Sequence, residues 1–200
     1  MFSTHTKSHW AVLFLFFSSF ATIAQDATNW KLDKAHTSVN FSINHFFSAV
    51  TGKFRSFEGQ IHFDPNNLAG SKAEFTVAVN SISTDDEKRD KHLQSADFFD
   101  VKRFPQMSFI STRIEKKSAK DFLIFGKLTI KDHTQELVLP MRITGEMEHP
   151  MNKGLIIMGL AIDTTIDRTS YGVGTGSWAA TAIVGDEVRI HIPMELNRRK

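Results

Sequence analysis

The sequence has no cysteine among its 200 residues. This absence excludes disulfide bonds, zinc–thiolate sites, cysteine nucleophiles and the lipidated cysteine of a lipoprotein anchor. Tyrosine is also scarce, with 1 residue, whereas phenylalanine occurs 18 times. The chain therefore has many apolar aromatic side chains with which to fill or line an interior.

A strong excess of either charge is lacking as well. The chain has 24 Lys and Arg residues against 22 Asp and Glu residues, a formal net charge of +2. Nucleic-acid-binding proteins usually cluster their basic residues, but here both signs are interspersed, apart from a basic tail at 198–200. We interpret this tail as solvated and expect no nucleic-acid partner.

The first 24 residues have the order of a secretory signal peptide. Lys7 precedes the apolar run 10–17, and small residues follow up to Ala24. The run is too short for a permanent membrane span, which needs roughly 20 residues, and no later run is long enough. We expect cleavage after Ala24, an exported domain over 25–200, location in the periplasm or outside the cell, and no stable membrane insertion.

Alternation of apolar and polar residues dominates the rest of the chain and predicts half-buried strands separated by turns. About eight strands, mostly in hairpin order, predict an all-β antiparallel barrel or sandwich. The segments with this pattern are 39–45, 57–64, 73–79, 107–114, 122–130, 136–143, 155–164 and 187–196.

A charged segment, 84–109, interrupts the strands. Thr84 and Glu87 form a capping-box pattern, so we expect a helix to begin at Thr84. Pro105 is incompatible with a helix interior and marks the start of the next strand. A helix without an apolar stripe cannot lie in a core, so we predict a short helix at the rim of the barrel.

Two of the expected strands are apolar on both faces. They are 155–162 and 122–130, the latter with Leu123 and Phe125 on its second face. A helix, a loop or a second subunit would have to cover them.

The interior and the charged block each allow two interpretations. Side chains can fill an eight-stranded barrel, or the barrel can hold one small ligand. Burial of a lipid tail would contribute about 0.8 kcal/mol per CH₂. Arg89, Asp90 and His92 could receive a polar headgroup, or Arg89 and Asp90 could hydrogen-bond the helix to the rim.

The sequence predicts no metal, cofactor or catalytic site. Its histidines lack a close ligand spacing, and no G-x-S-x-G elbow is present. The glycines at 172, 174 and 176 lack the strand–helix context of a dinucleotide fingerprint and indicate a turn. An enzyme acting on a lipid-like substrate, with His92 and Asp90 or His45, stays as an alternative.

Ordered motifs over 30–196 give the chain a family resemblance. The motifs are Trp30-Lys31-Leu32-Asp33, His36, Ser38, Phe41, His45, Gly52-Lys53-Phe54, Phe57, Gly59, Arg89-Asp90-x-His92-Leu93, Asp97-Phe98-Phe99-Asp100, Pro105, Phe109-x-Ser111, Gly126-x-Leu128-Thr129-Ile130, Leu139-Pro140, Arg168 and Gly172. On these motifs the chain resembles the YceI-like family of exported polyisoprenoid-binding proteins. Lys131 and Tyr171 depart from the family pattern, where glycine and phenylalanine are more usual.

The resemblance implies a lipocalin-like, eight-stranded antiparallel β-barrel with a helical segment at its rim. It also implies a binding protein, not an enzyme, with a tunnel for a polyisoprenoid, a quinone-like molecule or a fatty amphiphile. Members can be homodimers. The alternative is a packed structural or stress-related barrel without a ligand. The candidate ligand-binding residues are Phe41, Ile43, His45, Phe57, Ile61, Phe75, Val77, Phe109 and Tyr171 on the wall, and Arg89, Asp90 and His92 at the entrance.

Overall fold

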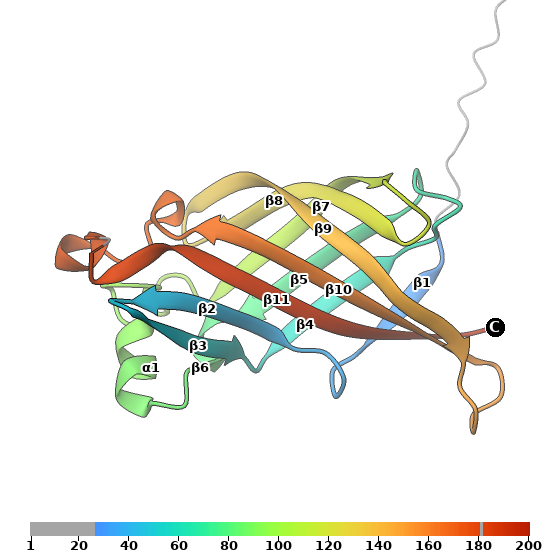
Figure 1. Ribbon diagram of the computed structural model, residues 1–200, viewed down its shortest axis with the longest axis horizontal. Helices are drawn as coiled ribbons and strands as arrows, with labels where there is room; N and C mark the ends of the chain where they lie inside the picture. The colour runs from blue at the N-terminus through green and yellow to red at the C-terminus, as the bar shows by residue number, and fades with distance from the viewer. Residues whose placement is uncertain (1–26, 181) are drawn as a thin grey trace, which may run out of the picture.

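The computed structural model describes residues 27–180 and 182–200 (Figure 1). The signal peptide expected at 1–24 lies outside the described residues. The strands are β1 (Asn29–Asp33), β2 (Val39–His45), β3 (Ser48–Phe54), β4 (Phe57–His62), β5 (Lys72–Ala78), β6 (Ile82–Ser83), β7 (Gln106–Lys116), β8 (Asp121–Ile130), β9 (His133–Glu148), β10 (Leu155–Asp167) and β11 (Val184–Arg199). The helices are α1 (Glu87–Leu93) and the short 3₁₀ turns η1 (Val79–Ser81), η2 (Thr169–Tyr171) and η3 (Gly176–Ala179).

Eight of these strands form a closed antiparallel ring. Their order is β1-β4-β5-β7-β8-β9-β10-β11, and pairing of β1 with β11, with Leu32 opposite Leu196, closes the ring. The predicted all-β, eight-stranded antiparallel barrel is confirmed.

One of the eight strands in the ring is not among those that the sequence predicted. The segment 39–45, which is β2, lies outside the ring, and β1 takes its place. The 16-residue β11 has two neighbours on one edge: its end around Glu195–Asn197 pairs with β1, and its beginning, 184–191, pairs with β2. The strands β3 and β6 continue from β2 as a side branch of the barrel.

The end of the barrel that β1 closes is packed with side chains. Trp30, Phe63, Phe122, Met158 and Leu196 are all at most 4% exposed there. The Trp30 indole donates a 2.8 Å hydrogen bond to the Phe63 carbonyl, and the Phe63 and Phe122 rings meet edge-on with centroids 5.2 Å apart. Each such side chain stabilises the fold by about 1.5–3 kcal/mol through burial.

The helix α1 lies at the other end of the barrel, beside β2, β3 and β6 (Figure 1). Its N-cap is Asp86, whose carboxylate accepts from the Arg89 backbone N–H at 2.9 Å, so the prediction of Thr84 as the cap was wrong. None of its residues is buried, in agreement with a rim position.

The outer faces of β8 and β10 are half-buried by the chain itself. Leu123, Phe125, Leu155 and Ile157 have intermediate exposure, and the Arg113 guanidinium lies 3.5 Å from the centre of the Phe125 ring. Neighbouring side chains therefore give part of the expected cover, and the homodimer stays a prediction. Within 27–180 and 182–200, no helix has the length and apolar character that a membrane span requires.

Candidate ligand-binding cavity

The half of the barrel beside α1 is hollow. A cavity of about 520 Å³ occupies it, within the usual range for sites that bind small molecules. On β10, Ile162 and Ile166 line the cavity, whereas Met158 of the same inward row belongs to the packed end. On β11, Met194 is the last lining residue before the buried Leu196. Along each of these strands, the inward-facing side chains thus form a packed core at one end of the barrel and the wall of the cavity at the other.

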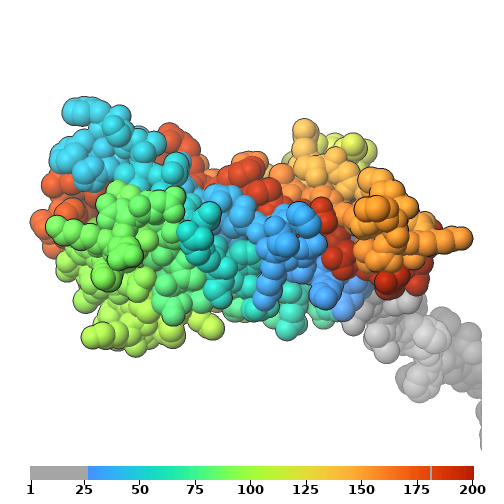
Figure 2. Space-filling view, turned by 90° about the horizontal axis from the view of Figure 1, so that it is seen from below, coloured from blue at the N-terminus to red at the C-terminus, as the bar shows by residue number. Residues whose placement is uncertain are grey.

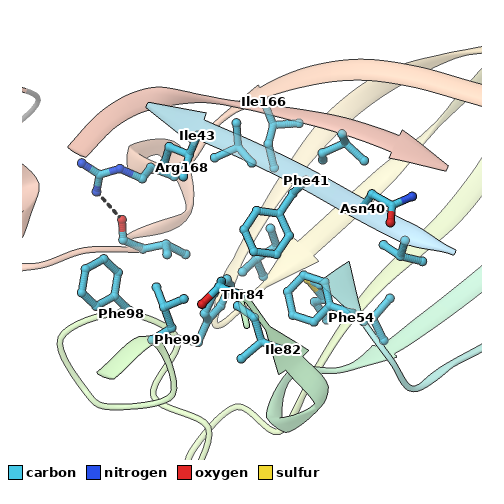
Figure 3. A pocket seen from close by; sticks show the side chains of 18 of the residues that line it. Asn40, Phe41, Ile43, Phe54, Ile82, Thr84, Phe98, Phe99, Ile166 and Arg168 are labelled. Carbon is cyan, nitrogen blue, oxygen red and sulfur yellow. Dashed lines mark hydrogen bonds between the residues drawn. The ribbon is translucent and has the colours of Figure 1, made fainter. Parts of the chain in front are cut away.

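The cavity wall is mainly aliphatic and aromatic. Figure 3 shows Phe41, Ile43 and Ile166 above Phe54, Ile82 and Phe99, all directed at one another across the space. Further wall residues, none of them among the candidate ligand-binding residues of the sequence analysis, are Val39, Val50, Leu93, Met107, Leu128, Ile130, Leu137, Leu139, Val173, Val184, Val188, Ile190, Ile192 and Met194.

Eight of the twelve candidate residues line this cavity. They are Phe41, Ile43, His45, Phe75, Val77, Arg89, His92 and Phe109. The other four lie elsewhere. Phe57 and Ile61 belong to the main buried core, and the Asp90 carboxylate accepts a hydrogen bond from the hydroxyl of Thr84. Tyr171 lies in a second buried cluster with Phe98, Ile130 and Val173, where burial raises the pKa of its phenol.

Two wall phenylalanines depend on glycines of neighbouring strands. A Cβ on Gly52 would lie 2.4 Å from the Phe41 ring, and a Cβ on Gly126 would lie 2.4 Å from the Phe109 ring. Real Cβ atoms do not come so close, so glycine lets each ring lie over its neighbour's backbone. These glycines therefore help to define the width of the cavity.

Arg89 and Asp90 join α1 to the rim through Thr84, which is 6% exposed. The Arg89 side chain donates from Nε to the Thr84 hydroxyl at 2.7 Å and from a terminal nitrogen to the Thr84 carbonyl at 2.8 Å. The Asp90 carboxylate accepts from the Thr84 backbone N–H at 2.8 Å and from its hydroxyl at 2.6 Å. The sequence left open whether Arg89 and Asp90 bind a headgroup or hydrogen-bond the helix to the rim, and the structure has the second arrangement.

Arg168 is a second anchor, which sequence reasoning did not place in the site. Its side chain is almost fully buried and donates to the carbonyls of Gly185 at 2.8 Å, Val173 at 2.7 Å and Val184 at 2.8 Å. Figure 3 draws one of these bonds. Burial lowers the pKa of the guanidinium, although the carboxylate of Asp186 at 4.0 Å partly opposes this shift. The residue thus holds the segment after β10 against the start of β11.

Aromatic side chains from separate segments meet at the mouth of the cavity. The ring of His92 contacts those of Phe98 and Trp178, with centroids 5.1 Å and 4.9 Å away. His92 Nε2 lies 3.1 Å from the Asp97 carboxylate, and the Asp97 carbonyl accepts from the Thr175 backbone N–H at 2.8 Å. The mouth is therefore formed by α1, the loop that follows it and the loop before β11.

One group of possible metal ligands lies away from the cavity. Across 27–180 and 182–200, the single group of three with ligand atoms within 4.8 Å of one another is Asp33, His36 and Glu195. Asp33 hydrogen-bonds His36, which lowers the pKa of the Asp33 carboxyl and, with the charge of Glu195, raises that of the His36 imidazole. None of the three lines the cavity.

Comparison with known proteins gives consistent results. The sequence matches the YceI-like domain family over residues 30–196. A UPF0312 protein of Enterobacter sp. strain 638 is 39% identical over 134 residues, which are 66% of this chain and 69% of the relative. A UPF0312 protein of Staphylococcus aureus strain USA300 is 32% identical over 85% of this chain and 98% of the relative.

Solved structures have the same fold. The crystal structure of Burkholderia cenocepacia BcnA superposes with a TM-score of 0.73 at 28% identity, over 82% of this chain and 99% of that one. A polyisoprenoid-binding domain from Saccharophagus degradans superposes with a TM-score of 0.62 at 12% identity, over 84% of this chain and 97% of that one. The second likeness, at this identity, concerns the fold alone.

Proposed function

Because this chain belongs to the YceI-like family, we propose that it is an exported carrier of an amphiphile whose long isoprenoid or fatty tail occupies the barrel cavity. The observation that carries this proposal is the apolar cavity of about 520 Å³ with its mouth beside α1. A tail with about ten buried CH₂ groups would gain about 8 kcal/mol from burial, before the entropy cost of binding.

The two guanidinium groups that line the cavity, unlike the Lys88 ammonium, are already engaged in hydrogen bonds, which favours an uncharged headgroup beside them. Arg89 already donates to Thr84, and Arg168 donates to three carbonyls. A phosphate or carboxylate headgroup would need new hydrogen bonds from guanidinium groups that are already used. A quinone ring or a fatty amide makes no such demand, so we place these headgroups ahead of a polyprenyl phosphate.

We infer binding without catalysis. The enzymatic alternative paired His92 with Asp90 or with His45, but the carboxylate beside His92 is that of Asp97, and Asp90 is bonded to Thr84. The family assignment supports a carrier.

The proposed site of action follows from the leader sequence. The order of residues in 1–24 is that of a signal peptide, so we place the mature protein in the periplasm or outside the cell. Fractionation of cells with an intact mass measurement would test this, and a chain that keeps residues 1–24 in the cytoplasm would contradict it.

Native mass spectrometry with a cavity-blocking variant tests the carrier function. Leu137 lines the cavity, whereas Val138, the next residue of β9, points outward and is 40% exposed. We expect natively purified protein to carry a long-chain amphiphile, or to take up a polyprenyl quinone added in detergent. Leu137→Trp should lose most of this occupancy and Val138→Trp should keep it. Equal occupancy in both variants, or no uptake by the unmodified protein, would refute the proposal.

A further inference from the structure

Two phenylalanines are exposed at the tip of the β2–β3 hairpin. Phe46 is 56% exposed and Phe47 is fully exposed, although their neighbours in sequence form a regular antiparallel pair with His45 opposite Ser48. Two adjacent large apolar side chains in solvent are unfavourable unless another surface covers them.

The backbone of this tip is unusual for its residues. Phe46 has a φ of 51°, in the left-handed region that a two-residue hairpin turn normally fills with glycine or asparagine. A bulky residue in this conformation raises the energy of the fold. The strained conformation indicates that a phenylalanine at this position serves something other than stability.

The tip adjoins the mouth of the cavity. The Phe46 backbone N–H donates to the Ile183 carbonyl at 2.9 Å, and His45 pairs with Val184. Both His45 and Val184 line the cavity. The hairpin and α1 lie at the same end of the molecule, where the light-blue atoms of the hairpin project in Figure 2. Apolar surface therefore continues from the cavity wall to the tip.

This side of the mouth carries no charged side chain. Neither 39–52 nor 169–185 contains Asp, Glu, Lys or Arg, whereas α1 on the other side has the sequence EKRDKHL. The uncharged lip, defined here as 44–49 together with 174–180 and 182–184, also contains Trp178. Exposed aromatic residues without nearby charge are suited to the interface of a bilayer, where charged groups would be costly to bury.

We propose that the uncharged lip docks on a lipid bilayer through Phe46 and Phe47, so that a tail passes from the membrane into the cavity with little exposure to water. This inference rests on the proposed carrier function. A second copy of the chain fits the tip less well. Two phenylalanines offer roughly 300–500 Å² at most, whereas a stable interface buries about 800 Å² on each partner.

Binding to phosphatidylcholine vesicles tests the docking. The variant Phe46→Ser/Phe47→Ser removes both rings, and Met151→Ser is the matched control, since Met151 is 90% exposed in the β9–β10 turn at the packed end. We expect the double variant to bind vesicles at least roughly tenfold more weakly, because burying one phenylalanine is worth more than this factor. The control should bind as the unmodified protein does, and binding should change little with salt.

A loading measurement separates failure of the docking from failure of the carrier function. The probe is a fluorescent long-chain fatty amide, delivered either from phosphatidylcholine vesicles or from detergent micelles. We expect the double variant to load slowly from vesicles and normally from micelles. No loading of the unmodified protein from micelles would refute the carrier function itself.

Three results would overturn the docking alone. The first is that the double variant loads normally from micelles and also binds vesicles as strongly as the unmodified protein. The second is that Met151→Ser weakens vesicle binding as much as the double variant does. The third is a dimer of the unmodified protein in sedimentation that Phe46→Ser/Phe47→Ser dissociates. Because Phe47 is fully exposed and makes no ring contact that would be lost, Phe47→Ser alone gives a second, milder variant if the double variant is poorly folded.

Discussion

Replacing Arg168 with methionine should weaken the whole barrel, because this guanidinium is a buried cation that ties together three segments of the backbone beside the cavity. It donates three hydrogen bonds of 2.7–2.8 Å to the carbonyls of Val173, Val184 and Gly185, and it is 3% exposed. A hydrogen bond to a charged group contributes about 1.5–3 kcal/mol, and a carbonyl left unpaired in a buried position adds a cost of its own.

The expected loss in the free energy of unfolding is about 3–5 kcal/mol, less than the sum of the bonds because the guanidinium no longer has to be desolvated. For a chain of this size the loss corresponds to a fall of about 6–20 °C in Tm. In Arg168→Lys the charge is kept, but one ammonium group cannot reach all three carbonyls. The stability of this variant should therefore lie between that of the unmodified protein and that of Arg168→Met.

Urea unfolding at neutral pH measures both variants, and hydrogen exchange at the amides of 173–185 reports the local effect. We expect these amides to exchange faster in Arg168→Met even under conditions in which the rest of the barrel is intact. A loss below about 1 kcal/mol in Arg168→Met, or a lysine variant as stable as the unmodified protein, would show that the three-carbonyl arrangement contributes little.

Three further predictions concern the rim, the mouth and the surface. Thr84→Val should destabilise the protein by about 1–3 kcal/mol in urea unfolding, because it removes the hydroxyl that links two α1 side chains, and Thr84→Ser should not; equal losses would contradict this. Gly174→Ala should lower Tm more than Gly176→Ala, since a Cβ on Gly174 would lie 2.2 Å from the buried guanidinium whereas Gly176 faces open space; the reverse order would be inconsistent with the structure. His36→Gln should cost stability at acidic pH and little at alkaline pH. The pKa of His36 is raised by Asp33, so its stabilisation is present below the ordinary histidine pKa and is lost as pH rises through the raised value. A cost that grows with pH in urea unfolding at several pH values would refute the assignment.

The strand pattern allowed most of the barrel to be predicted, and the missed strands have weak patterns. Seven of the expected segments became ring strands, because long alternation reports burial on one face. The strand β1 has five residues and only Trp30 and Leu32 as inward positions, and β3 has mostly small or polar residues. Neither short pattern distinguishes a strand from a loop.

The position of the cavity could be predicted only in part. Alternation showed that Phe57 and Phe75 point inward, but Phe57 lies in the packed core and Phe75 lines the cavity. The difference depends on which side chains meet at the same height in the barrel, and this height is fixed by the β1–β11 closure. The alternation of apolar and polar residues within one strand does not determine how far that strand is shifted relative to its neighbours.

The residues that hold the mouth left little local signal. Asp86 and Thr84 are equally suitable caps, and tertiary contacts decided between them, because the Thr84 hydroxyl is occupied by α1 side chains. Arg168 reads as a surface charge at the end of a strand, yet its partners are carbonyls up to 17 residues later in the chain. Sequence periodicity does not report backbone acceptors.

Because the barrel has a packed end and a hollow end, different residues determine the stability of the fold and the shape of the cavity. Residues such as Phe122 and Leu196 fill the packed end, whereas Leu137 and Ile190 line the cavity. Substitutions among the latter can reshape the chamber while the former keep the chain folded. The same scaffold can thus hold cavities of different shape without risking collapse of the fold.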